Sequence, residues 1–129
     1  MTTPTKTPIR SYRDLTVWQR ALELIEEVYR VTERLPKAEL HGLCSQMRRS
    51  AVSVAANIAE GHSRRAIRDY QRMLSIANGS LRQLETYVEI CFGLDYLSRD
   101  QWTHGETLST EVGRMLTGLR GALRRRTEE

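Results

Sequence analysis

Apolar side chains recur every three or four residues along four stretches of the chain, the spacing that gathers them on one face of an α-helix. These stretches cover about residues 15–35, 36–61, 63–92 and 98–123. Proline or glycine stands near most of their boundaries, and no segment alternates apolar and polar residues as a strand does. The pattern predicts an all-α fold, an antiparallel up-down-up-down four-helix bundle with short loops.

The second stretch is unusual in this charged chain, because residues 50–59 carry no charge and no large side chain. A helix that is apolar around most of its circumference is usually covered on most sides. We therefore expect it to be covered by its own chain and by a second copy, with Ala55, Ala56 and Ala59 at the contact between copies. Gly61 is expected to end this helix as a residue with positive φ.

Polar residues beside the apolar faces should pair inside the bundle, because an unpaired charge is costly to bury. Arg48 or Arg49 is expected to find a carboxylate partner, for which the candidates are Glu60 and Glu85. Asn57 is expected to form a hydrogen bond within the bundle. If the ion pair is buried, replacing Glu85 with alanine should cost several kcal/mol.

The predicted helices make one domain, residues 14–126, between two short tails. Residues 1–13 contain two prolines and are expected to form a flexible basic arm. The last helix contains several glycines, so we expect it to fray after Leu123 and residues 127–129 to be disordered.

Composition narrows the class of protein. The chain is 40% hydrophobic and 28% charged, and no apolar run reaches the roughly 18–20 residues that span a bilayer. The first residues also lack the apolar core of a secretory signal, so a cytoplasmic location without membrane contact is expected. Cys44 and Cys91 lie at apolar positions and are expected to be buried free thiols.

The formal net charge is +4, and its distribution along the chain is uneven. Acidic residues dominate residues 14–35, whereas residues 62–82 hold five arginines against Asp69 alone. Four of these arginines are the candidate nucleic-acid-binding residues, placed on or beside one helix face: Arg64, Arg65, Arg68 and Arg72. The alternative is a solvated face, paired with Asp69 or with the acidic helix of a neighbouring copy.

Candidate catalytic chemistry is missing. His41 and Cys44 have a spacing that suits two metal ligands, but no second matched pair follows. Glu26, Glu27 and Glu33 are expected to form a solvated face, and no glycine-rich phosphate loop is present. We expect no catalytic residues, no metal, no cofactor and no small-molecule substrate.

Three motifs resemble those of one bacterial family. The sequence reads Leu-x-Val-Trp-x-x-Ala at residues 15–21, Asn-Ile-Ala-Glu-Gly at 57–61 and Gly-Ser-Leu-x-x-Leu-Glu-Thr at 79–86. In these motifs the chain is similar to the four-helix-bundle proteins encoded in intervening sequences of 23S rRNA genes. The resemblance implies a ring-like homopentamer. A related branch, the accessory variability determinants of retroelements, implies binding to RNA and to a reverse transcriptase through a basic surface.

Two functional hypotheses follow. The first is a non-catalytic, homo-oligomeric helical bundle that binds RNA or a nucleic-acid enzyme, such as a reverse-transcriptase-like protein, through its arginines. The alternative is a structural or scaffolding oligomer that binds a protein partner without nucleic acid.

Overall fold

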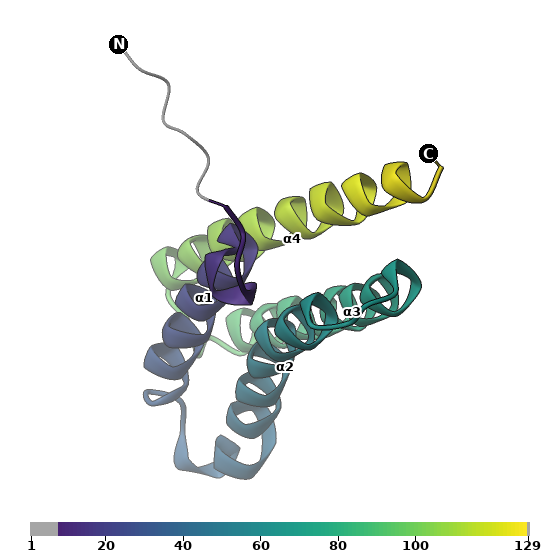
Figure 1. Cartoon of the computed structure of the whole chain (residues 1–129). Coiled ribbons are helices and arrows are strands. Elements are labelled where there is room, and N and C mark those ends of the chain that lie inside the picture. The colour runs from purple at the N-terminus through teal and green to yellow at the C-terminus, as the bar shows by residue number, and fades with distance from the viewer. Residues whose placement is uncertain (1–7, 129) are drawn as a thin grey trace.

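The structure, a computed structural model, describes residues 8–128 and contains four α-helices and no strand within them (Figure 1). They are α1 (Thr16–Thr32), α2 (Ser45–His62), α3 (Ile67–Gly93) and α4 (Arg99–Glu128). The all-α prediction with four helices is therefore confirmed.

The four helices pack around one shared core. Helix α2 packs on α1 and α3, and α4 closes the arrangement by packing on both α1 and α3. The largest fully buried side chains come from all four helices: Leu24, Met47, Ile58, Leu74, Leu81, Leu84, Leu116, Val54, Val112 and Cys91. In Figure 1 the α3–α4 pair is inclined to the α1–α2 pair, and the regular up-down-up-down packing stays a prediction.

Helix α2 begins later than the sequence predicted. Residues 37–44 instead form a 3₁₀ turn, Lys37–Glu39, followed by one wide π turn, Leu40–Cys44. The backbone leaves helical geometry at Gly42, with φ −106° and ψ −106°. The Tyr96 hydroxyl donates a hydrogen bond of 3.1 Å to the Glu39 carboxylate, which ties this turn to the α3–α4 connection.

Gly61 does not end α2 in the way that was predicted. No glycine among residues 8–128 has positive φ, and Gly61 is buried inside the last turn of the helix. A Cβ atom there would lie 2.9 Å from Met73 Cβ and 2.9 Å from Tyr70 Cδ1. Glycine is needed here because α3 passes too close for any side chain. The requirement comes from packing and has nothing to do with ending the helix.

Hydrogen bonds cap the end of α3 and the start of α4. Asp95 takes φ 61°, which lets the Tyr96 amide donate to the Cys91 carbonyl at 2.9 Å and close α3. The Ser98 hydroxyl accepts from the Gln101 amide at 3.1 Å, while the Gln101 side chain accepts from the Ser98 amide at 2.8 Å. This reciprocal pair is a capping box that fixes the start of α4.

The predicted tails are partly wrong. Helix α4 does not fray after Leu123, and its helical residues include Thr127 and Glu128, which were expected to be disordered. Within the predicted arm, Ser11 caps a short 3₁₀ turn, Tyr12–Asp14, whose Asp14 carboxylate accepts from the Arg10 and Ser11 amides. These two bonds lower the pKa of Asp14. Residues 1–7 and 129 lie outside the described residues.

Both cysteines are buried free thiols, as predicted. Cys91 Sγ lies 3.6 Å from Met47 Sδ, and Cys44 Sγ lies 3.4 Å from the Thr32 carbonyl oxygen. Burial raises the pKa of Cys91 to about 11, with a smaller contribution from Cys44. Because the thiolate is the reactive form, Cys91 is protonated and unreactive at neutral pH.

Candidate nucleic-acid interface

The four candidate arginines lie where the chain passes from α2 to α3. Arg64 and Arg65 are in the connection that precedes α3, and Arg68 and Arg72 are on the first turns of the helix. All four side chains are exposed. The prediction that Arg65 shares a helix face is wrong, because α3 begins only at Ile67. Arg68 and Arg72, four residues apart, do share a face.

These arginines differ in their partners. Arg64 Nη2 pairs with Glu60 Oε1 at 2.6 Å across the end of α2. Arg65, Arg68 and Arg72 form no ion pair with any side chain in the described part of the chain, and neither does Asp69, their expected local partner. Three guanidinium groups are therefore free to contact phosphates from outside.

Tyr70, the aromatic residue between Arg68 and Arg72, faces inward. Its side chain is 9% exposed, and burial raises the pKa of its hydroxyl. The ring meets the His62 ring nearly at right angles, and its hydroxyl oxygen lies 3.4 Å from His62 Nδ1. Tyr70 holds the start of α3 against the end of α2 and offers no surface on which a base could stack.

The predicted ion pair of Arg48 or Arg49 does not form. The Arg48 Nε donates to Thr32 Oγ1 at 2.9 Å, and its guanidinium lies over the Tyr29 ring of α1. Arg49 is exposed and has no ion-pair partner among residues 8–128. Sequence spacing could not show that this side of α2 faces α1.

The two predicted carboxylate partners pair elsewhere. Glu60 binds Arg64, and Glu85 Oε1 accepts from Arg82 Nη1 at 2.5 Å, one turn away on α3. Glu85 lies toward α4, where it lines a hollow of about 320 Å³ with Arg82 and Arg114. It therefore points away from the α1–α2 side on which Arg48 lies.

Asn57 does form a hydrogen bond within the bundle, as predicted. Its Nδ2 donates to the Ser53 carbonyl at 2.8 Å and reaches Ser53 Oγ at 3.0 Å. Ser53 Oγ in turn lies 2.8 Å from Ser80 Oγ of α3. The sequence did not lead us to predict this serine pair. The serines that interrupt the alanines of α2 were the feature that could have indicated it.

The alanines of the predicted copy-to-copy contact face different ways. Ala55 is 5% exposed and belongs to the chain's own core, so it is not available to a second copy. Ala56 is exposed and Ala59 is half-buried. Val52, one turn before Ala56 on α2, is 42% exposed, and Tyr29 of α1 is 41% exposed. Val52 and Tyr29 line a shallow hollow of about 360 Å³ together with Arg48, Arg49 and Ser53.

One predicted surface residue is buried. Glu27 was expected on a solvated face of α1, but the structure places it inside, where it pairs with Arg30 and lies 3.6 Å from His104 Nε2 of α4. The Arg30 guanidinium is the cationic partner of this carboxylate, which a buried carboxylate needs. Elsewhere in residues 8–128, no cluster of three His, Cys, Asp or Glu side chains could hold a metal ion. No described helix is long and apolar enough to cross a membrane.

These features define an all-helical protein with four α-helices and an exposed arginine cluster between the second and the third. The chain belongs to the 23S rRNA-intervening sequence protein family, which matches residues 13–118. A solved structure, a protein of unknown function from the S23 ribosomal protein family of Bacteroides thetaiotaomicron, has the same fold with a TM-score of 0.76. It is 24% identical to this chain, and the match covers 81% of this chain and 98% of that one. No curated protein matches the sequence.

Proposed function

We propose that this protein is a non-catalytic, homo-oligomeric helical bundle that binds RNA through the arginines between α2 and α3. The observation that carries the proposal is the state of Arg65, Arg68 and Arg72, which are exposed and form no ion pair with any described side chain. Arg64 is expected to contribute less, because Glu60 already holds its guanidinium. Phosphate contacts by arginine supply affinity without sequence readout.

An oligomer would multiply this surface, and the outer face of α2 is the proposed contact between copies. Ala56 and the partly exposed Val52 and Tyr29 form apolar surface there. We place Ala56 and Ala59 at the contact, and propose a pentamer, located in the cytoplasm. The family resemblance, rather than the fold of one chain, supports the number five.

Two substitutions on neighbouring positions of α2 test the oligomer. Ala56→Arg should leave a folded protein that runs as a monomer, measured by light scattering after gel filtration. Ala55→Arg places a charge in the core and should unfold the chain instead. If Ala56→Arg keeps the size of the wild-type oligomer, the contact lies elsewhere.

Fluorescence anisotropy with a labelled structured RNA tests the RNA proposal. Binding should persist near physiological salt and weaken steeply as salt rises, because each neutralised phosphate releases counterions. The triple variant Arg65→Gln, Arg68→Gln, Arg72→Gln should weaken binding and flatten the salt dependence, and it should melt at the wild-type temperature. An absence of RNA binding even at low salt rejects the proposal.

A second candidate function is a scaffold that binds a protein partner, and the hollow between Tyr29 and Val52 favours it. Its lining combines apolar surface with Arg48 and Arg49, a mixture common at protein contacts. Partner binding would then be lost in a Val52→Glu variant and unaffected by the arginine triple variant. The RNA proposal predicts that the arginine triple variant loses binding.

A further inference from the structure

Helix α4 continues past the part of the chain that matches the family. The match ends at residue 118, whereas α4 runs to Glu128. This extension carries four arginines: Arg120, Arg124, Arg125 and Arg126. Leu123 is 4% exposed and belongs to the core, so the extension packs on the bundle up to that point.

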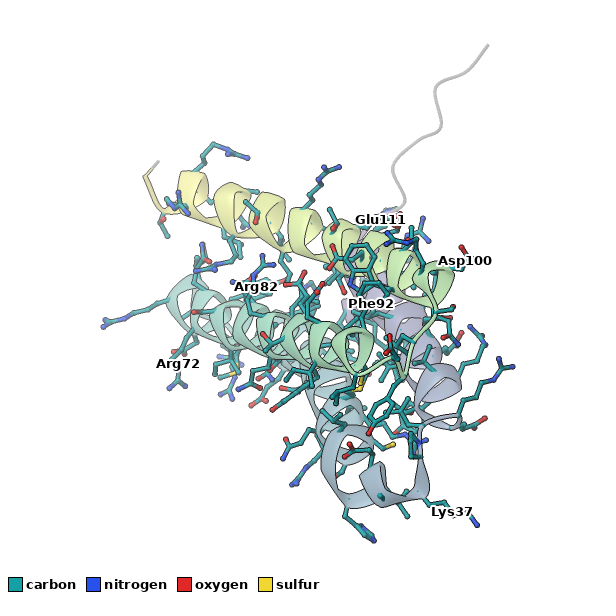
Figure 2. The ribbon with its side chains drawn as sticks, turned by 180° about the vertical axis from the view of Figure 1, so that it is seen from behind. Lys37, Arg72, Arg82, Phe92, Asp100 and Glu111 are labelled. Carbon is teal, nitrogen blue, oxygen red and sulfur yellow. The ribbon has the colours of Figure 1, made fainter. Side chains whose placement is uncertain are left out.

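The extension lies beside the start of α3. Gln71 Nε2 donates a hydrogen bond of 2.8 Å to the Arg120 carbonyl, which fixes how the two helices are aligned. Figure 2 shows Arg72 at the same end of the molecule as the C-terminal end of α4. At a rise of about 1.5 Å per residue, Arg124 lies about 6 Å beyond Arg120, level with the first turn of α3.

The charges at this end are unbalanced. Arg124, Arg125 and Arg126 are exposed and form no ion pair with a described side chain. Within residues 60–72 and 120–127 there are eight arginines, listed as Arg64, Arg65, Arg68, Arg72, Arg120, Arg124, Arg125 and Arg126. Taken to residue 129, the same ranges hold four carboxylates, Glu60, Asp69, Glu128 and Glu129, and Glu60 is engaged by Arg64. We call this surface the basic end.

Aromatic residues distinguish the kinds of nucleic acid that such a surface can hold. Proteins that grip single strands stack bases on exposed aromatic rings. Within residues 60–72 and 120–127 the aromatic rings are Tyr70, which is buried, and His62, which is half-buried and packs edge-on against Tyr70. A surface of arginines without a fully exposed ring suits the phosphate backbone of a double helix, in which the bases are already stacked.

We propose that the basic end binds the backbone of double-stranded RNA and that Arg124, Arg125 and Arg126 supply part of the contacts. This inference rests on the proposed function and goes beyond it, because it assigns a binding role to residues outside the family match and names the form of RNA. It adds the arginines of the α4 extension to those at the start of α3.

Three variants of equal charge change test the assignment against a 20-base-pair RNA duplex by anisotropy at several salt concentrations. The first is Arg124→Gln, Arg125→Gln, Arg126→Gln. The second is Arg65→Gln, Arg68→Gln, Arg72→Gln. The control, Arg34→Gln, Lys37→Gln, Arg49→Gln, removes three exposed charges from residues outside the basic end. A shorter chain that lacks residues 124–129 repeats the first test without new side chains.

The α4 variant should reduce the slope of log affinity against log salt by up to about 2.7, since each lost phosphate contact contributes about 0.9 and three arginines are removed. The control should keep the wild-type slope. If the α4 variant and the shortened chain match the control while the α3 variant binds more weakly, this inference is wrong and the proposed function stands. If the α3 variant also matches the control, both fail.

Two further ligands test the form of nucleic acid. A single-stranded RNA of the same length should bind at least tenfold more weakly than the duplex. Equal or tighter binding of the single strand overturns the duplex assignment. A DNA duplex of the same sequence should bind more weakly than the RNA duplex, and tighter binding would reject RNA as the ligand.

Discussion

Helix α3 packs in two different ways on its two neighbours. Against α2 it is close: Gly61 leaves no room for a Cβ, and Ser53 and Ser80 share a hydrogen bond across the contact. Against α4 it leaves a hollow of about 320 Å³ whose lining includes Arg82 and Arg114. The difference teaches that the fold is specified mainly by small residues at the α2–α3 contact, while the α3–α4 side is free to carry charge.

The glycines follow the same division. Gly61 touches two residues of α3, whereas a Cβ on Gly79, Gly105 or Gly118 would meet nothing within 4 Å. Glycine inside a helix costs roughly 1 kcal/mol relative to alanine. At Gly61 close packing offsets that cost, and at the open positions nothing in the described structure does.

The largest effect is expected from Gly61→Ala. The new methyl group would overlap Met73 and Tyr70, so we expect a loss of about 1–3 kcal/mol in the free energy of unfolding. Urea unfolding followed by circular dichroism measures it. Gly79→Ala on α3 is the matched control and should not destabilise the protein. Equal stability of the two variants would mean that the α2–α3 contact is looser than described.

Gly118→Ala should act in the opposite direction. The position is exposed in the middle of α4 and has open space around it, so alanine should stabilise the protein by about 0.5–1 kcal/mol. The same unfolding measurement applies. A loss of stability would show that this turn of α4 needs the freedom of glycine.

Glu85→Ala probes the α3–α4 side and should have a small effect. The carboxylate is 22% exposed and its partner Arg82 is 58% exposed, so the pair is worth about 0.3–0.5 kcal/mol. This replaces the several kcal/mol expected for a buried pair. A loss above about 2 kcal/mol would show that Glu85 supports the contact with α4 through more than Arg82.

Ionisation of the Cys91 thiol should leave the free energy of unfolding unchanged at neutral pH and lower it measurably in alkali. Its pKa is raised in the folded state to about 11, so folding favours the thiol. The stabilisation is complete below the pKa of the unfolded thiol and is lost as pH rises from about 9 through 11. Burial also raises the pKa of the Tyr70 hydroxyl, so its ionisation likewise lowers the stability of the folded state in alkali. Unfolding of wild type and Cys91→Ala between pH 7 and 10.5 isolates the thiol, and parallel curves would contradict this account.

Much of the fold could be predicted because apolar periodicity reports directly on burial. Leu74, Ala77, Leu81 and Leu84 recur at helical spacing in the sequence, and all four are buried on the inner face of α3. The helix boundaries were less accurate where tertiary contacts decide them. The wide turn at Leu40–Cys44 depends on Gly42 and on Glu39 held by Tyr96 from far along the chain. No local pattern contains that contact.

The candidate site was predictable only in part, because sequence gives exposure more readily than partners. The exposure of Arg68 and Arg72 follows from their opposition to Tyr70 on α3, whereas Arg65 is exposed in the connection before the helix. The pairing of Arg48 with Thr32 and Tyr29, and of Glu85 with Arg82, depends on which neighbouring helix each face meets. The alignment of the α4 extension with the start of α3 depends on the contact of Gln71 with the Arg120 carbonyl, which joins residues 49 positions apart.

The end of α4 has a practical consequence for handling the protein. After Leu123 the helix presents only exposed side chains up to Thr127, yet its position relative to the bundle is set by buried residues one turn earlier. A fluorophore or spin label attached near Arg126 would therefore be carried by a continuous helix whose earlier turns are anchored in the core. Such a label could report distances between copies in an assembly or to a bound duplex without disturbing the core.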